Sequence, residues 1–266
     1  GEVYIPSGHF KLHAGDVLSF VGSRPMSRAF LDFIGFKTNR VSDAMIVGGG
    51  DVAYYLANQL INMGIDVKII EKEKERCERL SILLPKAVII NADGTDQDVL
   101  KEEGLSNAES FVALTGIDEE NILLTLHARH VSDAKTITKI NRSNFKEVIS
   151  NLNLGSVFYP SFITAETITA YVRAKSNTRS MNSSVQTLYH MFDFRVEAIE
   201  FRVDEASEVT GKPLMDLKLK KDVLIAFINR NGTIITPSGH DAIEVGDTAM
   251  VVTTHTGFND IRDILA

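Results

Sequence analysis

A glycine-rich segment directly after a short apolar run constrains the fold of this chain more than any other feature. Residues 44–47 lead into Gly48-Gly49-Gly50-Asp51-Val52-Ala53 and then into an apolar-periodic helix. This is the G-x-G-x-x-G/A pattern of a strand, a tight turn and a helix start. Gly48 permits the turn, Gly50 lets the backbone approach a pyrophosphate, and Ala53 allows close packing of helix on strand. The pattern predicts a Rossmann-type nucleotide-binding unit.

An acidic residue supports this interpretation. Glu71 ends the second apolar run about 20 residues after the glycines, where a carboxylate would accept hydrogen bonds from both ribose hydroxyls and repel a 2′-phosphate. It therefore favours NAD over NADP. The candidate cofactor-binding residues are Gly48, Gly49, Gly50, Asp51, Val52, Glu71, Asp93, Gly94, Thr115, Gly116, Lys139 and Arg142.

The later candidates follow the ends of further apolar runs. Asp93-Gly94 ends the third run, where adenine rings commonly rest, and Thr115-Gly116 ends the fourth, above the switch point of the sheet. Lys139 and Arg142 end the fifth run and could reach phosphate oxygens. The alternatives stay open: Asp93 and Thr115 could be simple strand-end caps, and the two cations could be solvated surface charges.

Short apolar runs alternate with helical patterns between residues 43 and 175, which is typical of βαβ units and a parallel sheet. The predicted strands are residues 43–47, 66–70, 87–91, 110–114 and 135–140. The predicted helices are residues 52–63, 75–83, 96–103, 119–130, 145–152 and 161–175. We therefore expect an α/β fold with a Rossmann-like, doubly wound parallel sheet.

A repeat frames this central segment. Pro6-Ser7-Gly8-His9 recurs as Pro237-Ser238-Gly239-His240, and at the same offset Gly15-Asp16 recurs as Gly246-Asp247. Self-similarity at a fixed offset indicates a repeated structural unit. Each copy is predicted to form a strand, a Pro-Ser-Gly turn, a second strand entered through Gly-Asp, and a short helix at residues 30–34 or 261–265.

The repeat and a polar stretch predict the domain organisation. Residues 176–184 are small and polar, as in a linker. We expect residues 1–35 to be the C-terminal part of a preceding module, 43–175 the nucleotide-binding domain, and 185–266 a complete small α+β module. Because the chain opens with Gly1 in mid-repeat, we also expect it to be part of a longer protein.

Composition excludes some classes of function. The net charge is −7, and Lys and Arg are interleaved with acids, so no basic face for nucleic acid is expected. The single cysteine, Cys77, fits a reducing compartment, and no apolar run approaches the roughly 18 residues that cross a bilayer. These features predict a cytoplasmic protein.

No catalytic constellation is evident. His127-x-x-His130 lacks the third and fourth ligands of a metal site, and His9 and His240 occupy equivalent turns of the repeat. The sequence therefore predicts no catalytic residues, no metal site and no enzyme activity. An NAD-dependent oxidoreductase is the alternative, and a ligand-free dimerisation scaffold is a third hypothesis.

The motifs together resemble the RCK, or KTN, domains of Trk/Ktr-type potassium uptake systems and potassium-channel gating rings. The resemblance covers essentially the whole chain, and the TrkA type of subunit resembles two tandem copies of a TrkA-N domain followed by a TrkA-C module. Its marks are Gly48 to Ala53, Glu71, Asn91 to Asp96, Ala113 to Asn121, Lys139 to Arg142, Pro160-Ser161, Gly211 to Leu214, Asn229 to Gly232, Pro237 and Gly246-Asp247. Ala53 and Glu71 stand where the family more commonly has glycine and aspartate.

The resemblance implies a nucleotide-sensing regulatory subunit on the inner face of the cell membrane. It would bind NAD or NADH, or else ATP or ADP, and form a dimeric or tetrameric ring of identical subunits. Its partner would be a membrane potassium-translocating subunit of the TrkH, TrkG or KtrB type. Residues 161–175 would form a crossover helix that contacts a neighbouring subunit, with Phe162, Ile163 and Ile168 at the contact.

Overall fold

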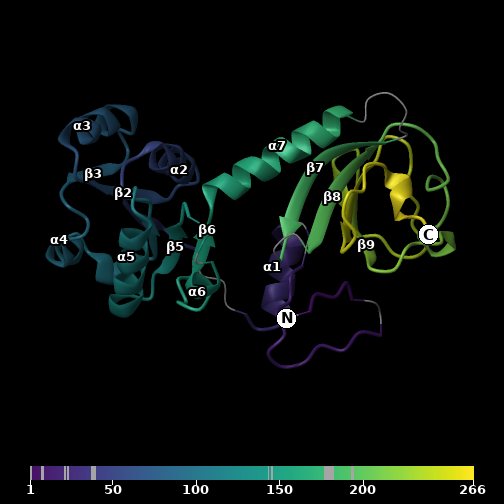
Figure 1. Cartoon of the computed structure of the whole chain (residues 1–266), viewed down its shortest axis with the longest axis horizontal. Coiled ribbons are helices and arrows are strands. Elements are labelled where there is room, and N and C mark those ends of the chain that lie inside the picture. The colour runs from purple at the N-terminus through teal and green to yellow at the C-terminus, as the bar shows by residue number, and fades with distance from the viewer. Residues whose placement is uncertain are drawn as a thin grey trace. The chain divides into compact units, whose positions relative to one another are not determined.

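The computed structural model describes residues 2–6, 9–20, 22, 24–36, 40–142, 144, 146–176, 183–192 and 195–266 (Figure 1). The chain divides into two units. One comprises Asn39–Phe162, and the other comprises Gly1–Thr38 together with Ile163–Ala266. In the ranges given above, no helix combines the length and the apolarity needed to cross a lipid bilayer.

The unit of residues 39–162 contains a parallel sheet in the order β3-β2-β1-β4-β5-β6. Its strands are β1 (Asp43–Val47), β2 (Asp66–Glu71), β3 (Val88–Asn91), β4 (Ser110–Ala113), β5 (Lys135–Lys139) and β6 (Ser156–Phe158). The order reverses between β1 and β4, which creates the crevice where doubly wound sheets bind ligands. The Rossmann-like fold and the five predicted strands are confirmed. The sequence analysis missed β6, which has only 3 residues.

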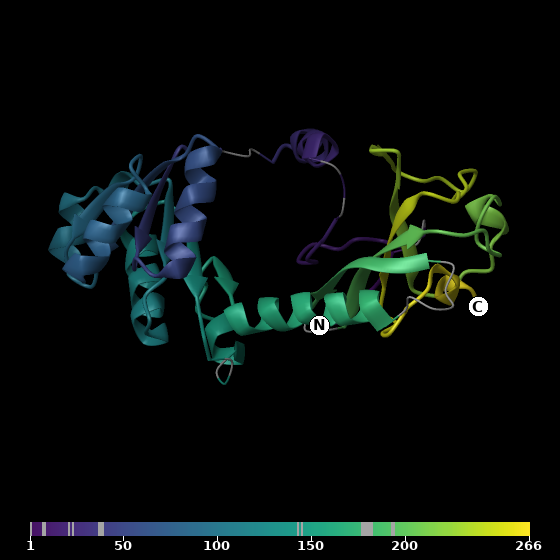
Figure 2. The same ribbon diagram turned by 90° about the horizontal axis from the view of Figure 1, so that it is seen from above.

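Helices cover both faces of this sheet (Figure 2). They are α2 (Asp51–Asn62), α3 (Lys74–Leu83), α4 (Gln97–Glu102), α5 (Asp118–Val131) and the short α6 (Lys146–Ser150). α2 and α3 pack on one face, where Ala53 and Leu80 join Ile46 in one cluster. α4 and α5 pack on the other, where Leu100 and Leu124 surround Phe111. Ala53 is completely buried, so a small residue is needed there.

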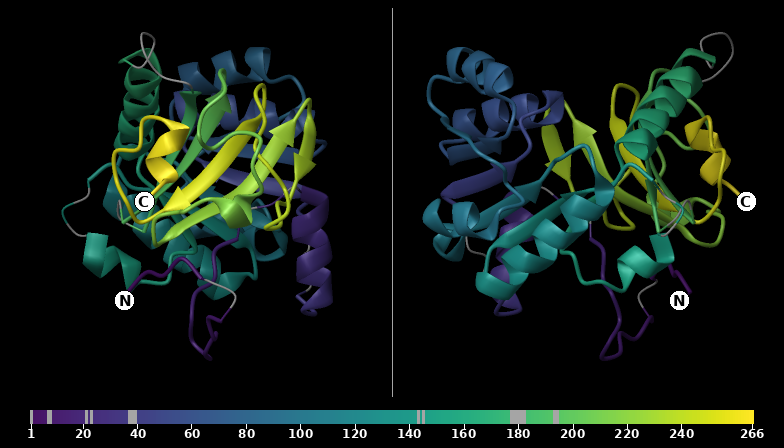
Figure 3. Two further views of the ribbon diagram at one scale, coloured as in Figure 1. Left: turned by 90° about the vertical axis from the view of Figure 1, so that its right-hand side faces the viewer. Right: turned by 60° about the vertical axis from the view of Figure 1, so that its left-hand side comes forward.

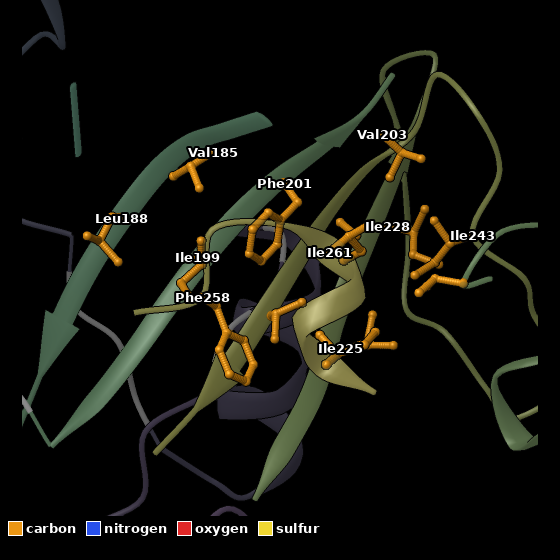
Figure 4. Packing of buried hydrophobic residues seen from close by; sticks show 14 residues of the cluster. Val185, Leu188, Ile199, Phe201, Val203, Ile225, Ile228, Ile243, Phe258 and Ile261 are labelled. Carbon is orange, nitrogen blue, oxygen red and sulfur yellow. The ribbon is translucent and has the colours of Figure 1, made fainter. Parts of the chain in front are cut away.

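The second unit is built on an antiparallel sheet in the order β10-β9-β11-β8-β7 (Figure 3). Its strands are β7 (Ser183–Met191), β8 (Val196–Val203), β9 (Val223–Arg230), β10 (Thr233–Ile235) and β11 (Thr248–Thr253). One face carries a core in which Phe201, Ile199 and Ile228 pack against Ile261 of the closing turn η3 (Ile261–Ile264) (Figure 4). This confirms the expected small C-terminal module.

A helix and a strand flank the central part of the predicted linker. α7 (Pro160–Ser176) agrees in extent with the helix predicted at residues 161–175, and β7 begins at Ser183, within the predicted linker. Residues 177–182 of that linker lie outside the described ranges. Ile163 and Ile168 on α7 are more than half exposed, while the Phe162 ring packs edge-on against Tyr159.

The repeat appears in atomic detail at the Gly-Asp turn. The His13 N–H donates to the Asp16 carboxylate at 2.8 Å, and the Glu244 N–H donates to the Asp247 carboxylate at 2.8 Å. Gly15 and Gly246, which precede the two aspartates, have φ angles of 97° and 93°, the left-handed region that favours glycine. The Pro-Ser-Gly turn of the first copy includes Ser7 and Gly8, which lie outside the described ranges.

The rest of the first copy differs from the prediction. No strand forms in the described residues between 2 and 36, and the helix α1 (Arg24–Phe33) is longer than the predicted residues 30–34. In the complete module β10 pairs with β9, and β11 pairs with β8 and β9. Residues 2–36 contain no counterparts of β8 and β9, so a strand there would lack a hydrogen-bonding partner. Val3 and Ile5 instead pack against an apolar face of the C-terminal sheet.

Candidate functional site

A cavity of about 340 Å³ opens at the carboxyl ends of the parallel strands, at the predicted crevice. Its lining includes the following predicted residues: Gly48, Gly49, Gly50, Glu71, Asp93, Gly94, Thr115, Gly116 and Lys139. It also includes Val47, Ile70, Lys72, Glu73, Arg76, Thr95, Leu114, Ile117 and Glu120. Asp51 and Val52 begin α2 next to the cavity, and neither they nor Arg142 belong to its lining.

The three glycines of the loop have different roles. Gly48 has a φ of +98°, and a Cβ atom there would lie 2.8 Å from the carbonyl carbon and oxygen of Leu114. A Cβ atom on Gly49 would lie 2.7 Å from Leu80 and 3.1 Å from Glu71. At Gly50, by contrast, nothing lies within 4 Å of such an atom. Gly48 and Gly49 are therefore needed for packing, whereas Gly50 leaves open space beside the cavity.

Gly50 is also the N-cap residue of α2, which begins at Asp51. It has extended backbone (φ −72°, ψ −175°), and no side chain in the described part of the chain hydrogen-bonds to the helix start. The first N–H groups of a helix carry a partial positive charge and lack partners within the helix. The start of α2 can therefore bind an anionic group such as a phosphate in the space beside Gly50.

Glu71 is held by the protein itself. Its side chain is 5% exposed, and one carboxylate oxygen accepts the Gly49 N–H at 2.7 Å while the other accepts the Glu73 N–H at 2.8 Å. The Arg76 guanidinium lies 3.4 Å from the first of these oxygens. Burial alone would raise the pKa of Glu71, but the two N–H donors and Arg76 outweigh burial and lower it. The carboxylate is thus charged at neutral pH and fixes the glycine loop to the end of β2.

Arg76 was not predicted from the sequence. It lies in a run of alternating charges that gave no reason to prefer one residue over its neighbours. In the structure it bridges Glu71 and Glu73, with its second terminal nitrogen 3.0 Å from the Glu73 carboxylate. It therefore neutralises part of the negative charge where a ribose is expected.

Asp93 and Thr115 each make local hydrogen bonds at a strand end and also lie on the cavity wall. The Asp93 carboxylate accepts the backbone N–H and the hydroxyl of Thr95 at 2.9 and 2.7 Å, so it caps the end of β3. These bonds lower its pKa. The Thr115 hydroxyl bonds to the backbone of Ile117. Both residues cap a strand end, and both also line the cavity.

Asn121 is a second residue whose role the sequence did not reveal. Its side chain is completely buried on α5. The amide oxygen accepts the Thr115 N–H at 2.8 Å, and the amide nitrogen donates to the carbonyls of Thr115 at 3.2 Å and Lys139 at 3.0 Å. It therefore holds the ends of β4 and β5 in fixed positions beside the cavity. A local signal was present only in the spacing, since Asn121 lies on the same helix face as the apolar Leu124 and Ala128.

The two predicted cations are separated. The Lys139 ammonium donates to the Leu114 carbonyl at 3.2 Å and lines the cavity. Burial lowers its pKa, and the nearby Asp118 opposes this. Arg142 instead pairs with the carboxylates of Asp118 and Glu119. Lys139 is thus available to a ligand in the cavity, whereas Arg142 stabilises the start of α5.

In this domain, the chemically reactive side chains of cysteine and histidine considered in the sequence analysis lie on two different helices. Cys77 is buried on α3, and burial followed by the charge of Glu71 raises the pKa of its thiol. His127 and His130 lie on α5. Within the residues that the structure describes, no group of three or more His, Cys, Asp or Glu side chains could hold a metal ion.

Comparison with known proteins places this site in a family. Residues 44–160 match the TrkA-N domain, and residues 198–266 match the TrkA-C domain. The chain is 29% identical over 264 residues to the Trk system potassium uptake protein TrkA homolog 1 of Methanosarcina mazei, covering 98% of this chain and 57% of that protein. It is 30% identical over 224 residues to the Trk system potassium uptake protein TrkA homolog of Pyrococcus horikoshii, covering 83% and 96%.

A solved structure shares the fold. The GsuK channel bound to NAD matches with a TM-score of 0.50 at 15% sequence identity, over 86% of this chain and 41% of that chain.

The chain spans just over half the length of the Methanosarcina relative and nearly the whole length of the Pyrococcus relative. The two domain matches and these relatives show that the chain belongs to the TrkA family of Trk system potassium uptake proteins.

Proposed function

We propose that the cavity at the strand ends binds NAD or NADH and that the chain uses the nucleotide as a signal without transforming it. The observation that carries this proposal is the start of α2, which has no side-chain cap among the described residues, beside the open space at Gly50. Two phosphates need N–H donors, close approach of the backbone and a nearby cation. Gly50 supplies the first two, and Lys139 supplies the third.

The remaining lining residues fit the other parts of the nucleotide. Glu71 and Arg76 lie at the end of β2, where the adenosine ribose is held in doubly wound sheets. Asp93, Gly94 and Thr95 follow β3 and would contact the adenine ring. The similar GsuK channel structure is bound to NAD, which supports NAD over ATP or ADP for this chain.

The same proposal includes a regulatory role. The relatives are named as potassium uptake proteins of the Trk system. By analogy the chain would lie in the cytoplasm at the inner face of the membrane, assemble into a ring of identical subunits, and gate a potassium-translocating subunit of the TrkH, TrkG or KtrB type. Exposed apolar residues of α7, such as Ile163 and Ile168, would contact a neighbouring subunit. Residues 1–35 would be the end of a preceding TrkA-C-like module.

Signalling by this route requires two ring geometries. Nucleotide can shift their populations only by binding one geometry more tightly than the other. The glycine loop is suited to such coupling because Glu71 joins it to β2 and α3, and because Gly48 packs closely against Leu114, whose carbonyl accepts from Lys139. A change in the loop on binding therefore reaches several elements of the domain.

Calorimetric titration with NAD, NADH, ATP and ADP tests the proposal, on the native chain and on Gly50→Asp. Light scattering after size exclusion would measure assembly in each state. We expect saturable NAD or NADH binding that Gly50→Asp abolishes, with an altered assembly and unchanged nicotinamide absorbance. Consumption of NADH with candidate substrates would favour the oxidoreductase alternative. Absence of binding to the native chain would leave a ligand-free scaffold.

A further inference from the structure

Glu120 is a carboxylate of the cavity wall that the interactions described so far do not use. It lies in the first turn of α5, two residues after Asp118, and is partly exposed to the cavity. Asp118 and Glu119, its neighbours, are both paired with Arg142. In the described part of the chain, the Glu120 carboxylate makes no hydrogen bond and no ion pair.

The charges on the cavity wall are unevenly distributed. At the end of β2, Arg76 pairs with Glu71 and Glu73, and Lys72 also lines the cavity. On the other side of the switch point, Lys139 lines the cavity together with Glu120. Arg142, three residues after Lys139, is held outside the lining by its two carboxylate partners. Beyond the space proposed for the two phosphates of the nucleotide, the described residues of the cavity wall therefore carry no excess of positive charge.

We propose that Glu120 is the residue that makes this site select a dinucleotide over a nucleoside triphosphate. The inference rests on the proposed function. In doubly wound sheets a dinucleotide spans the crevice, so its second half lies over the strand that follows the switch point, here β4. A second ribose offers two hydroxyl donors to Glu120, because an ionised carboxylate is an acceptor only. A third phosphate in that region would face the charge of Glu120 and be repelled.

The test compares Glu120→Gln with the native chain and with Glu102→Gln. The control removes the same charge from an exposed glutamate at the end of α4 that is not part of the lining. NAD, ADP and ATP are titrated calorimetrically into each protein with EDTA present. ADP serves as the reference because it carries two phosphates and no second ribose.

We expect Glu120→Gln to lower the ratio of NAD affinity to ATP affinity by at least about tenfold, which corresponds to about 1.4 kcal/mol. ATP would bind more tightly relative to ADP, and NAD more weakly. Glu102→Gln should leave the ratio unchanged. An equal ratio in the two variants would overturn the inference while leaving nucleotide binding intact. If the native chain binds none of the nucleotides, the proposed function fails and the inference with it.

A second titration addresses a competing role of the carboxylate. Glu120 would assist ATP if it held a divalent cation bridging the phosphates, since Mg²⁺ commonly binds one carboxylate and substrate phosphates. ATP is therefore titrated again with Mg²⁺ present. If the native chain then prefers ATP to NAD and Glu120→Gln removes that preference, Glu120 favours a triphosphate and the proposal is wrong. A preference for NAD that persists with Mg²⁺ supports it.

Discussion

The Glu71 carboxylate accepts a hydrogen bond from the Gly49 N–H at 2.7 Å and thereby joins the end of β2 to the glycine loop. Its other oxygen accepts the Glu73 N–H at 2.8 Å. A residue expected to bind ribose thus also holds the phosphate-binding loop in shape. Glu71 can still accept from a ribose, since a carboxylate has about four acceptor positions.

Glu71→Gln is expected to destabilise the domain. A glutamine side chain has one acceptor oxygen, so its NH₂ group would face one of the two backbone donors that Glu71 satisfies. Leaving a buried donor without an acceptor costs about 1–3 kcal/mol. Urea denaturation would measure this loss. Glu75→Gln on the exposed face of α3 is the control and should change the unfolding free energy by less than about 0.5 kcal/mol. Equal effects would contradict the anchoring role.

Substitution by alanine should have different effects on stability at Gly50 and at Gly48. Gly50→Ala places a methyl group in open space at a φ of −72°, so the unfolding free energy should change by no more than about 1 kcal/mol. Affinity for NAD should nevertheless fall at least about tenfold, or about 1.4 kcal/mol, because the methyl group occupies the space of the phosphates. Calorimetry and urea denaturation measure the two quantities.

The matched variant is Gly48→Ala. Gly48 has a φ of +98°, and the added Cβ atom would lie 2.8 Å from the Leu114 backbone, so we expect a loss of about 2 kcal/mol or more of stability. If Gly50→Ala unfolds as readily as Gly48→Ala, or binds NAD as well as the native chain, then the open space at Gly50 is not the phosphate site.

The sequence predicted the fold well because the strands β1 to β4 are rich in apolar residues and have polar or glycine-rich boundaries. The bounds of β1 to β5 agree with the predictions to within one residue. β6 was missed because 3 residues do not establish an alternation. In the described residues of the first repeat copy, the predicted strands are absent, because a strand depends on partners that a local pattern does not contain.

The site was predictable where a backbone requirement selects the residue type. Gly48 and Gly50 were found because a tight turn and a close approach need glycine. Asn121 and Arg76 were not found, because their roles depend on hydrogen bonds that join separate elements. Lys139 and Arg142, only three positions apart, could not be distinguished, since it is Asp118 on another element that turns Arg142 away from the cavity.

The hydrogen bonds of Asp118 allow a prediction of how the free energy of unfolding depends on pH. Burial would raise its pKa, but the N–H groups of Asn141 and Arg142 at 2.9 Å outweigh burial and lower it. A carboxyl group with a lower pKa in the folded state stabilises the protein above its unfolded pKa, near 3.9 for Asp, and that stabilisation is lost as the pH falls. Glu71 and Asp247 shift in the same direction. Stability should therefore change little between about pH 7 and pH 5 and fall steadily below about pH 4.

Asp118→Asn should make this loss shallower. The variant should be less stable than the native chain by about 1–3 kcal/mol at pH 7, and the difference should shrink towards pH 3. Urea denaturation across this range measures both curves. Asp133→Asn, a change at an exposed loop position, should run parallel to the native curve. A constant gap between Asp118→Asn and the native chain would show that the charge of Asp118 does not contribute.

The two copies of the Gly-Asp turn allow burial to be tested at constant local geometry. Asp247 and Asp16 each accept a backbone N–H at 2.8 Å from the residue three positions earlier. The Asp247 side chain is 2% exposed and also accepts two hydrogen bonds from Arg230, at 2.9 and 2.8 Å. The Asp16 side chain is 47% exposed. The turn is shared, but the buried ion pair belongs to the second copy.

Asp247→Ala should therefore cost about 2–3 kcal/mol of stability, because it leaves the Glu244 N–H without its acceptor and removes two of the hydrogen bonds of the partly buried Arg230 guanidinium. Asp16→Ala should cost less than about 1 kcal/mol, because water can replace the lost acceptor. Urea denaturation of the two variants, with a double-mutant cycle between Asp247→Ala and Arg230→Met, separates the ion pair from the turn. A coupling energy near zero in that cycle, or equal losses at the two aspartates, would mean that the turn alone determines the cost.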